Sequence, residues 1–437
     1  MATNECMLPE FNLFQSKPIQ HQVEKTYYQE FTPISIIGDK QPITIVAHGA
    51  PHQCWALHKS YLTVSCKITA DDGGNVADAV NVTVCNNVLD SLFQQIDVEL
   101  GDKQIAENNI LYPYRSYIEN TLCYSEEAQK TWMRGCCFIK DTAGQFAVFS
   151  RANDSTNVGA KERGVMFNAS TEVQLSGRPH CDLFNQDRVI LPNSKLTLKL
   201  IPSRDNFVLM TPAPGQNAAQ VNYKIKICEC RLNICVMQIS DSLNLALEKM
   251  LLTTNANYPI TRVTMKHMSI PIGTTNVLQD NLFLGKIPKR VVLGIVTDAS
   301  MGGGYQQNPF NFAPNGLNYL VLNVNGDMVP NKPLTPDYAN HKYLSVYNML
   351  FEGMRNQYSN TPVNITYSEF ENGYAFYVFD LTAHGHSGCM SSLQNGTVRI
   401  EAKFAAATTA VLNIICFAEY DDHFEVDKFG QTIALNY

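Results

Sequence analysis

The chain has 437 residues, of which 45% are hydrophobic and 17% charged, and this composition excludes a disordered or collagen-like protein. The net charge of −7 and the pI of about 5.8 exclude a basic protein that holds nucleic acid through its overall field. The chain is too long for one ordinary core, so we expect two domains of about 200 residues each.

The N-terminal segment is polar, shows little periodicity and is predicted to form an extended arm. It lacks a basic stretch followed by an apolar one, so we expect no signal peptide. No stretch reaches the ~18 apolar residues of a membrane span, and none is predicted. The 13 cysteines lie mostly within apolar strands. We interpret them as buried free thiols in a reducing compartment rather than as a disulfide framework.

Alternating apolar residues predict three strands in the first half of the chain: 59–69, 96–100 and 196–201. Between the last two, Pro113 begins a segment with Tyr114 and Tyr117 at helical spacing, which predicts a short amphipathic helix. Residues 140–176 have a weak pattern rich in Gly, Asn and Ser and are predicted to form a long exposed loop. Within 221–236 the apolar residues change from odd to even positions, which indicates a β-bulge.

Leucines at helical spacing in 240–252, with Ser240 or Asp241 as the N-cap, predict a helix that links two halves. A second crossover helix is predicted around Tyr343 and Leu350. Apolar segments predict these strands after the link: 261–270, 289–297, 317–324, 374–381, 398–404 and 411–420.

The two halves repeat one order of elements, an alternating strand, a Gly turn and a Tyr-bearing helix, in 92–118 and in 317–347. Gly101 and Gly326 are 225 residues apart, and a similar interval separates the helices. About eight strands per half, with a short helix in each crossover, predict an all-β chain of two tandem jelly-roll sandwiches, a double jelly roll. The predicted boundaries are an N-terminal arm at 1–25, a first jelly roll at 26–239, a linking helix and turn at 240–258, and a second jelly roll at 259–437.

Two segments carry zinc-binding residue types: His48, His52, Cys54 and His58 in one, and His384, His386 and Cys389 in the other. Neither supplies a complete set of four ligands, and we interpret both as loop residues. Gly302-Gly303-Gly304 lacks the Lys-Ser/Thr of a P-loop and is expected to be a flexible loop. No catalytic motif is found. We therefore predict no catalytic, metal-binding or cofactor-binding residue, no cofactor and no enzymatic activity.

A loop with the sequence Asn-Pro-Phe-Asn-Phe contains two large apolar side chains. If a neighbouring copy covers them, Phe310 and Phe312 form a subunit contact, and we name them as the candidate residues. If they fold back onto their own domain, they belong to the core instead. The sequence leaves these two interpretations equally open.

Four blocks resemble, in chain order, the major capsid proteins of Polinton/Maverick elements, which are adintovirus-like members of the double jelly-roll lineage that includes adenoviruses and virophages. The blocks are LYPYRSYIENTL (111–122), GRPHCDLFNQDRVILPNSKLTLKLIPSRDNF (177–207), NLFLGKIPKRVVLGIV (281–296) and NPFNF (308–312). The resemblance covers nearly all of 26–437 and leaves the arm outside.

The resemblance implies a structural protein whose homotrimers form pseudo-hexameric capsomers, which tile an icosahedral shell around double-stranded DNA. Its implied partners are further copies of itself, a penton or vertex protein and a minor capsid protein, without sequence-specific nucleic-acid binding. The implied location is the virion, after synthesis in the host cytoplasm and with the nucleus as one alternative for assembly. From the residues alone, a jelly-roll carbohydrate-binding protein and a cupin-like metal enzyme remain open.

Overall fold

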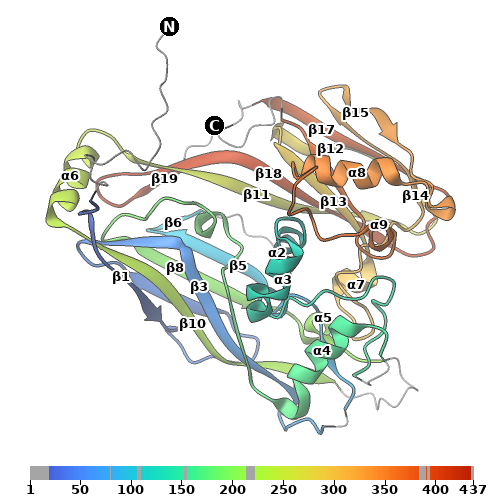
Figure 1. Cartoon of the computed structure of the whole chain (residues 1–437), viewed down its shortest axis with the longest axis horizontal. Helices are drawn as coiled ribbons and strands as arrows, with labels where there is room; N and C mark the ends of the chain where they lie inside the picture. The colour runs from blue at the N-terminus through green and yellow to red at the C-terminus, as the bar shows by residue number, and fades with distance from the viewer. Residues whose placement is uncertain are drawn as a thin grey trace, which may run out of the picture.

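The computed structural model describes residues 19–78, 80–105, 110–151, 155–212, 222–382, 390 and 394–434. Two β-rich units lie next to each other, with α2 and α3 where they meet and α8 on the front of the second unit (Figure 1). Among the described residues, each strand pairs only with strands of its own unit. We call these units the first and the second roll.

The first roll contains two four-stranded antiparallel sheets. Its eight sheet strands are β1 (Val23–Phe31), β2 (Ile43–His48), β3 (Gln53–Ala70), β5 (Phe93–Leu100), β6 (Lys103–Gln104), β7 (Val173–Gly177), β8 (Lys195–Pro202) and β10 (Tyr223–Ile239). They pair in the orders β1-β10-β3-β7 and β2-β8-β5-β6. A short pair, β4 (Thr83–Val84) with β9 (Leu209–Met210), lies outside these sheets.

The second roll repeats this arrangement strand by strand. Its strands are β11 (Ala256–Ile270), β12 (Asn276–Lys286), β13 (Arg290–Thr297), β14 (Leu317–Val324), β15 (Asp327–Leu334), β16 (Phe376–Asp380), β17 (Asn395–Phe404), β18 (Leu412–Val426) and, paired to β18, β19 (Thr432–Ala434). They pair in the orders β11-β18-β13-β16 and β12-β17-β14-β15. Counted within each roll, both give first-eighth-third-sixth and second-seventh-fourth-fifth. The predicted double jelly roll is confirmed.

The helices connect and cover the sheets. They are α1 (Val88–Ser91), α2 (Tyr112–Leu122), α3 (Glu126–Lys130), α4 (Val158–Met166), α5 (Asp205–Val208), α6 (Asp241–Leu251), α7 (Asp298–Gly302), α8 (Leu344–Gly353) and α9 (Tyr367–Glu371), with 3-10 helices η2 (Trp132–Cys136), η3 (Asn168–Ser170), η4 (Asp182–Phe184) and η5 (Tyr338–Asn340). Among the described residues, no helix is long and apolar enough to cross a membrane.

Strand periodicity produces the core as predicted. On β3, Leu62, Val64, Cys66 and Ile68 alternate with polar neighbours and are all buried between the two sheets of the first roll. Burying one such side chain contributes about 1.5–3 kcal/mol. The predicted bulge is confirmed, since the register of β10 against β3 shifts between Ile227 and Glu229. The described cysteines are all free thiols and most are buried, as expected, whereas Cys6 and Cys389 lie outside the described residues.

The predicted helices are present, and the prediction that α2 is amphipathic needs correction. The linking helix α6 begins after Ser240, whose side chain accepts a hydrogen bond from the Leu243 amide at 3.4 Å. No residue of α6 is buried, so its row of leucines is not part of the core. Helix α2 is not amphipathic in its exposure, because Ser116 and Asn120 on its polar side are buried as well.

The predicted exposed loop at 140–176 is also wrong. The structure places α4, η3 and the start of β7 there. Asp141, Asn157 and Arg163 have no exposed surface or nearly none. Their side chains are buried because they bind one another, and such long-range pairing leaves no periodic signal in the sequence. The Gly302–Gly304 segment is partly helical, since α7 ends at Gly302.

Candidate functional site

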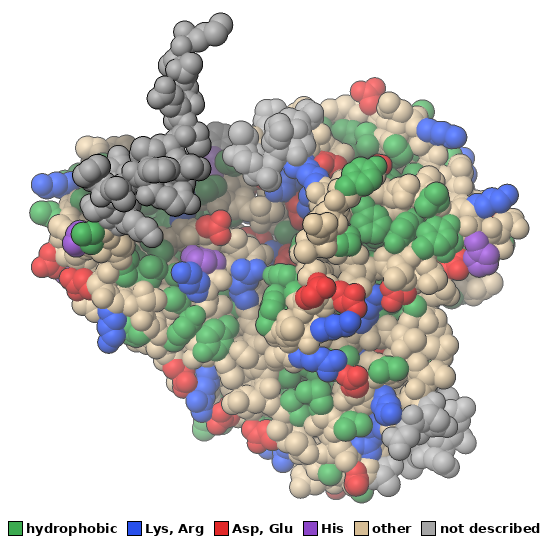
Figure 2. Space-filling view, in the orientation of Figure 1, with side chains coloured by type: hydrophobic (Ala, Val, Ile, Leu, Met, Phe, Trp, Pro, Cys, Tyr) green, Lys and Arg blue, Asp and Glu red, His purple; other side chains and the backbone are tan. Residues whose placement is uncertain are grey.

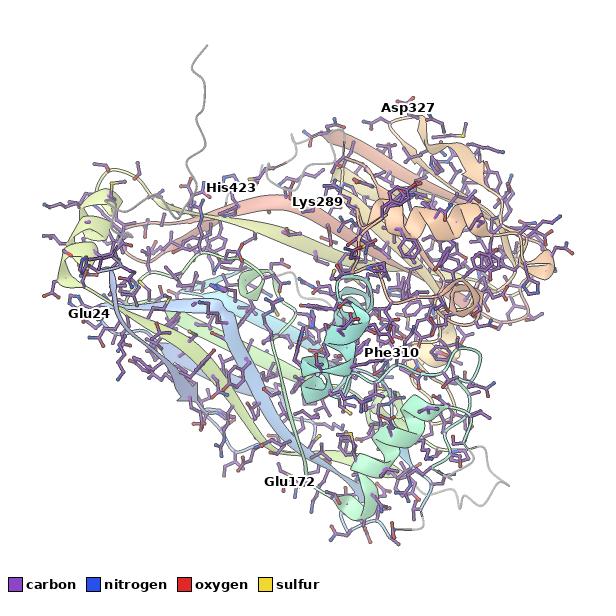
Figure 3. All side chains as sticks on the ribbon, in the orientation of Figure 1. Glu24, Glu172, Lys289, Phe310, Asp327 and His423 are labelled. Carbon is purple, nitrogen blue, oxygen red and sulfur yellow. The ribbon has the colours of Figure 1, made fainter. Side chains whose placement is uncertain are left out.

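The site that organises this molecule is the contact between the two rolls, and its centre is a cluster of four aromatic rings. Tyr114 and Tyr117 come from α2 in the first roll, and Phe310 and Phe312 come from the loop between β13 and β14 in the second. The rings of Tyr117 and Phe310 are stacked with centroids 4.2 Å apart, and Tyr114 meets Phe310 edge-on at 5.8 Å. Phe310 is labelled in Figure 3, close to α2. Aromatic pairs of this kind are worth about 0.5–1.5 kcal/mol beyond the area they bury.

The structure corrects the interpretation of Phe310 and Phe312 as a subunit contact. Both side chains are 0% exposed within the single chain, so neither offers a surface to another copy. Phe312 packs directly on β13, where a Cβ added to Gly294 would lie 2.5 Å from its ring. The absence of a side chain at Gly294 therefore provides the space for this ring. The second interpretation, that both rings fold back onto their own domain, describes them only in part, because Phe312 packs on β13 of its own roll whereas Phe310 stacks on Tyr117 of the first roll.

A buried polar network lies beside the aromatic cluster. The Arg163 guanidinium donates to Asp141 Oδ1 at 2.7 Å, and neither side chain is exposed. From the second roll, Asn308 Nδ2 donates to Asp141 Oδ2 at 3.3 Å and the Tyr374 hydroxyl donates to the Asp141 carbonyl at 2.7 Å. Burial lowers the pKa of Arg163, but Asp141 outweighs burial and holds that pKa above its usual value. Removing one partner from such a pair costs about 3–5 kcal/mol, because the other charge is left buried and unpaired.

Polar contacts between the rolls surround this centre. Lys140 of the first roll and Glu369 on α9 form an ion pair at 2.8 Å. Asn364 donates to Gln129 on α3 at 2.8 Å, and Asn206 on α5 donates to the carbonyl of Gly303 at 3.0 Å. The two rolls therefore form one packed unit with an apolar centre and a polar rim.

A second buried network lies within the first roll, beneath an open groove of about 590 Å³ that is lined by Tyr124, Trp132 and His180 among others. His180 Nδ1 lies 2.6 Å from Glu119 and its Nε2 lies 3.7 Å from Asp90. Arg115 pairs with Glu119 at 2.9 Å and with Asp182 at 2.6 Å.

The charged groups of this network shift one another's pKa values. Burial lowers the pKa of His180, but Asp90 and Glu119 outweigh burial and raise it above the usual value. Burial raises the pKa of Glu119, but Arg115 and His180 outweigh burial and lower it to about 2. The pKa values of Asp90 and Asp182 are raised, mainly by burial. The network is therefore most favourable while His180 carries its proton.

In the first segment with metal-ligand residue types, His48 ends β2 and Cys54 and His58 lie on β3, so of these four residues only His52 is a loop residue as interpreted. In the part of the chain that the structure describes, no three His, Cys, Asp or Glu side chains are placed to hold a metal ion. His52 lies 3.5 Å from Asp241, and Cys54 is buried in the core. His384, His386 and Cys389 lie outside the described residues. Gly303 accepts a hydrogen bond at the roll contact rather than lining a phosphate loop.

Sequence reasoning missed Asp141, Arg163 and His180, which are buried charged residues at the centre of the two networks. Each lies in a segment without strong periodicity. Arg163 and Asp141 are 22 residues apart along the chain, and Asn157, which also binds Asp141, is 16 residues from it, so local patterns carry no signal of the pairing.

The comparisons with known proteins agree with this architecture. No family model matches the sequence. An uncharacterised protein of Caenorhabditis elegans is 23% identical over 391 residues, which are 86% of this chain and 89% of that protein. A chain of the Sputnik virophage is similar in structure, with a TM-score of 0.65, 11% identity, and coverage of 100% of this chain and 93% of that one. This chain has a double jelly-roll fold.

Two further solved structures share that fold. The mavirus major capsid protein has a TM-score of 0.54 and 10% identity, and the match covers 99% of this chain and 95% of that one. The Faustovirus major capsid protein has a TM-score of 0.55 and 10% identity, with 94% and 91% covered. The likeness spans both rolls, so the neighbours share the two-roll plan rather than one sandwich.

Replacing Phe310 by Ala tests the roll contact. The ring is fully buried, so we expect a loss of about 3–5 kcal/mol in the free energy of unfolding, measured by urea denaturation at one protein concentration. Phe429 is 76% exposed, and Phe429→Ala serves as the control with an expected change within about 0.5 kcal/mol. Equal stability of the two variants would contradict the intrachain position of Phe310.

Replacing His180 by Gln tests the second network through pH. Because the folded-state pKa of His180 is raised, its contribution to stability is present below its unfolded value of about 6.5 and is lost as pH rises through the folded value. The wild-type melting temperature should therefore fall more steeply than that of His180→Gln as the pH rises above the unfolded value of about 6.5. His267→Gln, at an exposed histidine on β11, is the control. Parallel profiles for wild type and His180→Gln would refute this assignment.

Proposed function

We propose that this chain is a major capsid protein, and that three copies form a homotrimer with six jelly rolls, a pseudo-hexameric capsomer of an icosahedral shell. The observation that carries the proposal is the identical strand order of two rolls packed into one unit. A ring built from three such chains uses heterologous contacts, which need two similar but non-identical faces on each chain. Two rolls of one topology supply such faces.

The structural neighbours support a capsid role. The mavirus and Faustovirus proteins are major capsid proteins by name, and both matches extend over nearly the whole chain. The relative in a nematode supports an element carried by animals, and the four sequence blocks support the Polinton/Maverick lineage in particular.

The surface charge suits the wall of a DNA container. A net charge of −7 gives the protein no overall attraction to a polyanion. In this proposal the shell therefore encloses double-stranded DNA without sequence-specific contacts. A shell of this kind needs a penton protein at its vertices and a minor capsid protein between capsomers. We place the protein in the virion after synthesis in the host cytoplasm, with assembly there or in the nucleus.

A structural rather than an enzymatic role is supported by the roll interiors. The space between the sheets is filled by apolar side chains such as Val98, Leu198 and Ile400, whereas a cupin-like enzyme needs His and carboxylate ligands there. Within the described residues no metal-binding group is formed.

Light scattering on purified protein tests the proposal. We expect a particle of about three times the chain mass of 48.8 kDa, with hexagonal outlines in electron micrographs. A protein that stays monomeric at all concentrations and salt conditions, and that binds a glycan array saturably, would instead identify a carbohydrate-binding protein.

A further inference from the structure

The open groove of about 590 Å³ on the first roll, which we call the β3–η2 groove, has one wall formed by a bulge of β3. Residues 57–60 of β3 do not pair with β10, where the register of the two strands shifts. Inside the bulge, the buried Ser60 hydroxyl donates to the Ala56 carbonyl at 3.0 Å. Since a bulge redirects the side chains that it contains, His58 and Lys59 line the groove.

An exposed aromatic ring forms another part of the lining. Trp132 on η2 is 57% exposed, whereas Trp55, the other tryptophan of the chain, is 1% exposed. The rings of Tyr124 and Trp132 are nearly perpendicular with centroids 5.0 Å apart, and the Tyr124 hydroxyl accepts a hydrogen bond from Arg178 at 3.1 Å. The Trp132 ring is therefore held from one side, and it remains accessible to a ligand.

Two cationic side chains of this groove lack a carboxylate partner. Among the described residues, neither Lys59 nor Arg178 forms an ion pair. Burial lowers the pKa of His58, and Lys59 and Arg178 lower it further against the opposite effect of Asp187. The positive charges therefore lie close to one another on the same side of the groove as His58.

The carboxylate that lines this groove has partners of its own. Asp90 lies 3.7 Å from His180 and accepts a hydrogen bond from the Tyr112 hydroxyl at 2.6 Å. Figure 2 shows Lys, Arg and His side chains close together, left of the centre of the front face, next to hydrophobic side chains near α3. The groove thus combines unpaired positive charge with an exposed aromatic ring, in a chain whose net charge is −7.

We propose that the β3–η2 groove binds a short stretch of single-stranded nucleic acid without sequence preference. Every base has a planar face that can stack on Trp132, and the neighbouring phosphates pair with Lys59 and Arg178. A neutral ligand would leave both cations unpaired, and an anion without a ring would leave Trp132 uncovered. The contact is local, so it supplies an attraction to nucleic acid that the net charge of −7 does not. It needs no assembled shell and does not depend on the proposed homotrimer.

A fluorescently labelled oligothymidylate of about eight nucleotides tests the stacking contact. In fluorescence anisotropy, Trp132→Leu should bind it at least ~5-fold more weakly than wild type, because base–aromatic stacking is lost. Trp132→Tyr keeps a ring and should restore most of the affinity. Phe429→Leu, at a ring that is 76% exposed and outside the groove, is the control and should bind like wild type. An unchanged melting temperature confirms that each variant is folded.

The dependence of binding on salt tests the cations. A site that neutralises two phosphates of a single strand gives a slope of about −1.4 for log K against log salt concentration. Lys59→Ala should reduce this slope to about −0.7, whereas Lys332→Ala, at an exposed lysine on β15 of the second roll, should leave it unchanged. Equal slopes for wild type and Lys59→Ala would contradict the inference, and this test stands even if Trp132→Leu does not fold.

Two further ligands separate nucleic acid from other anions. An abasic oligomer of the same length keeps the phosphates and lacks the bases, and it should bind at least ~5-fold more weakly than the oligothymidylate. Equally tight binding of the abasic oligomer would overturn the inference, because stacking would then contribute nothing. An acidic peptide that contains Phe and binds more tightly than the oligothymidylate would also overturn it and identify a protein partner instead.

The outcomes separate this inference from the proposed function. Wild-type trimers that do not bind the oligothymidylate would overturn the inference and leave the proposed function standing. A wild-type protein that binds the oligothymidylate through Trp132 but stays monomeric would support the inference and overturn the proposed function.

Discussion

The packing of α2 between the two rolls is the constraint on which the rest of this structure depends. A jelly roll covers its own core. Each roll here also carries aromatic side chains on its outer surface, and these are buried because the other roll packs against them. Tyr117 and Phe310 stack across the boundary, and Asp141 binds polar groups from both sides of it. Because an apolar cluster and a buried ion pair lie side by side, the two rolls are fixed in one relative orientation.

That orientation explains how duplicated units become non-equivalent. The strand orders of the two rolls are the same, so their connections project helices from corresponding places. Helix α2 is covered by both rolls, whereas Leu344 on α8 and Val165 on α4 are exposed. Two units of one topology in one chain therefore present similar but non-identical outer surfaces.

Much of the fold is predictable from the sequence because the spacing of apolar residues along a strand or a helix is a local pattern. The alternation at 59–69 located β3, the phase change in 221–236 located the bulge near Ile227, and Ser240 marked the start of α6. The edge strands β12 and β15 were missed, since their exposed residues lack a clean alternation. The sequence around Phe310 and Phe312 does not show whether their loop packs against its own chain or against a neighbouring copy. The partnership of Arg163 with Asp141 depends on tertiary placement that no local period encodes.

The most direct test of this account is a cryo-electron microscopy reconstruction of the purified assembly. The account predicts a closed ring of six jelly rolls from three chains, in which α2 keeps its place between the two rolls of one chain. A reconstruction without three chains in a closed ring, or one in which the two rolls of one chain are separated, would contradict it.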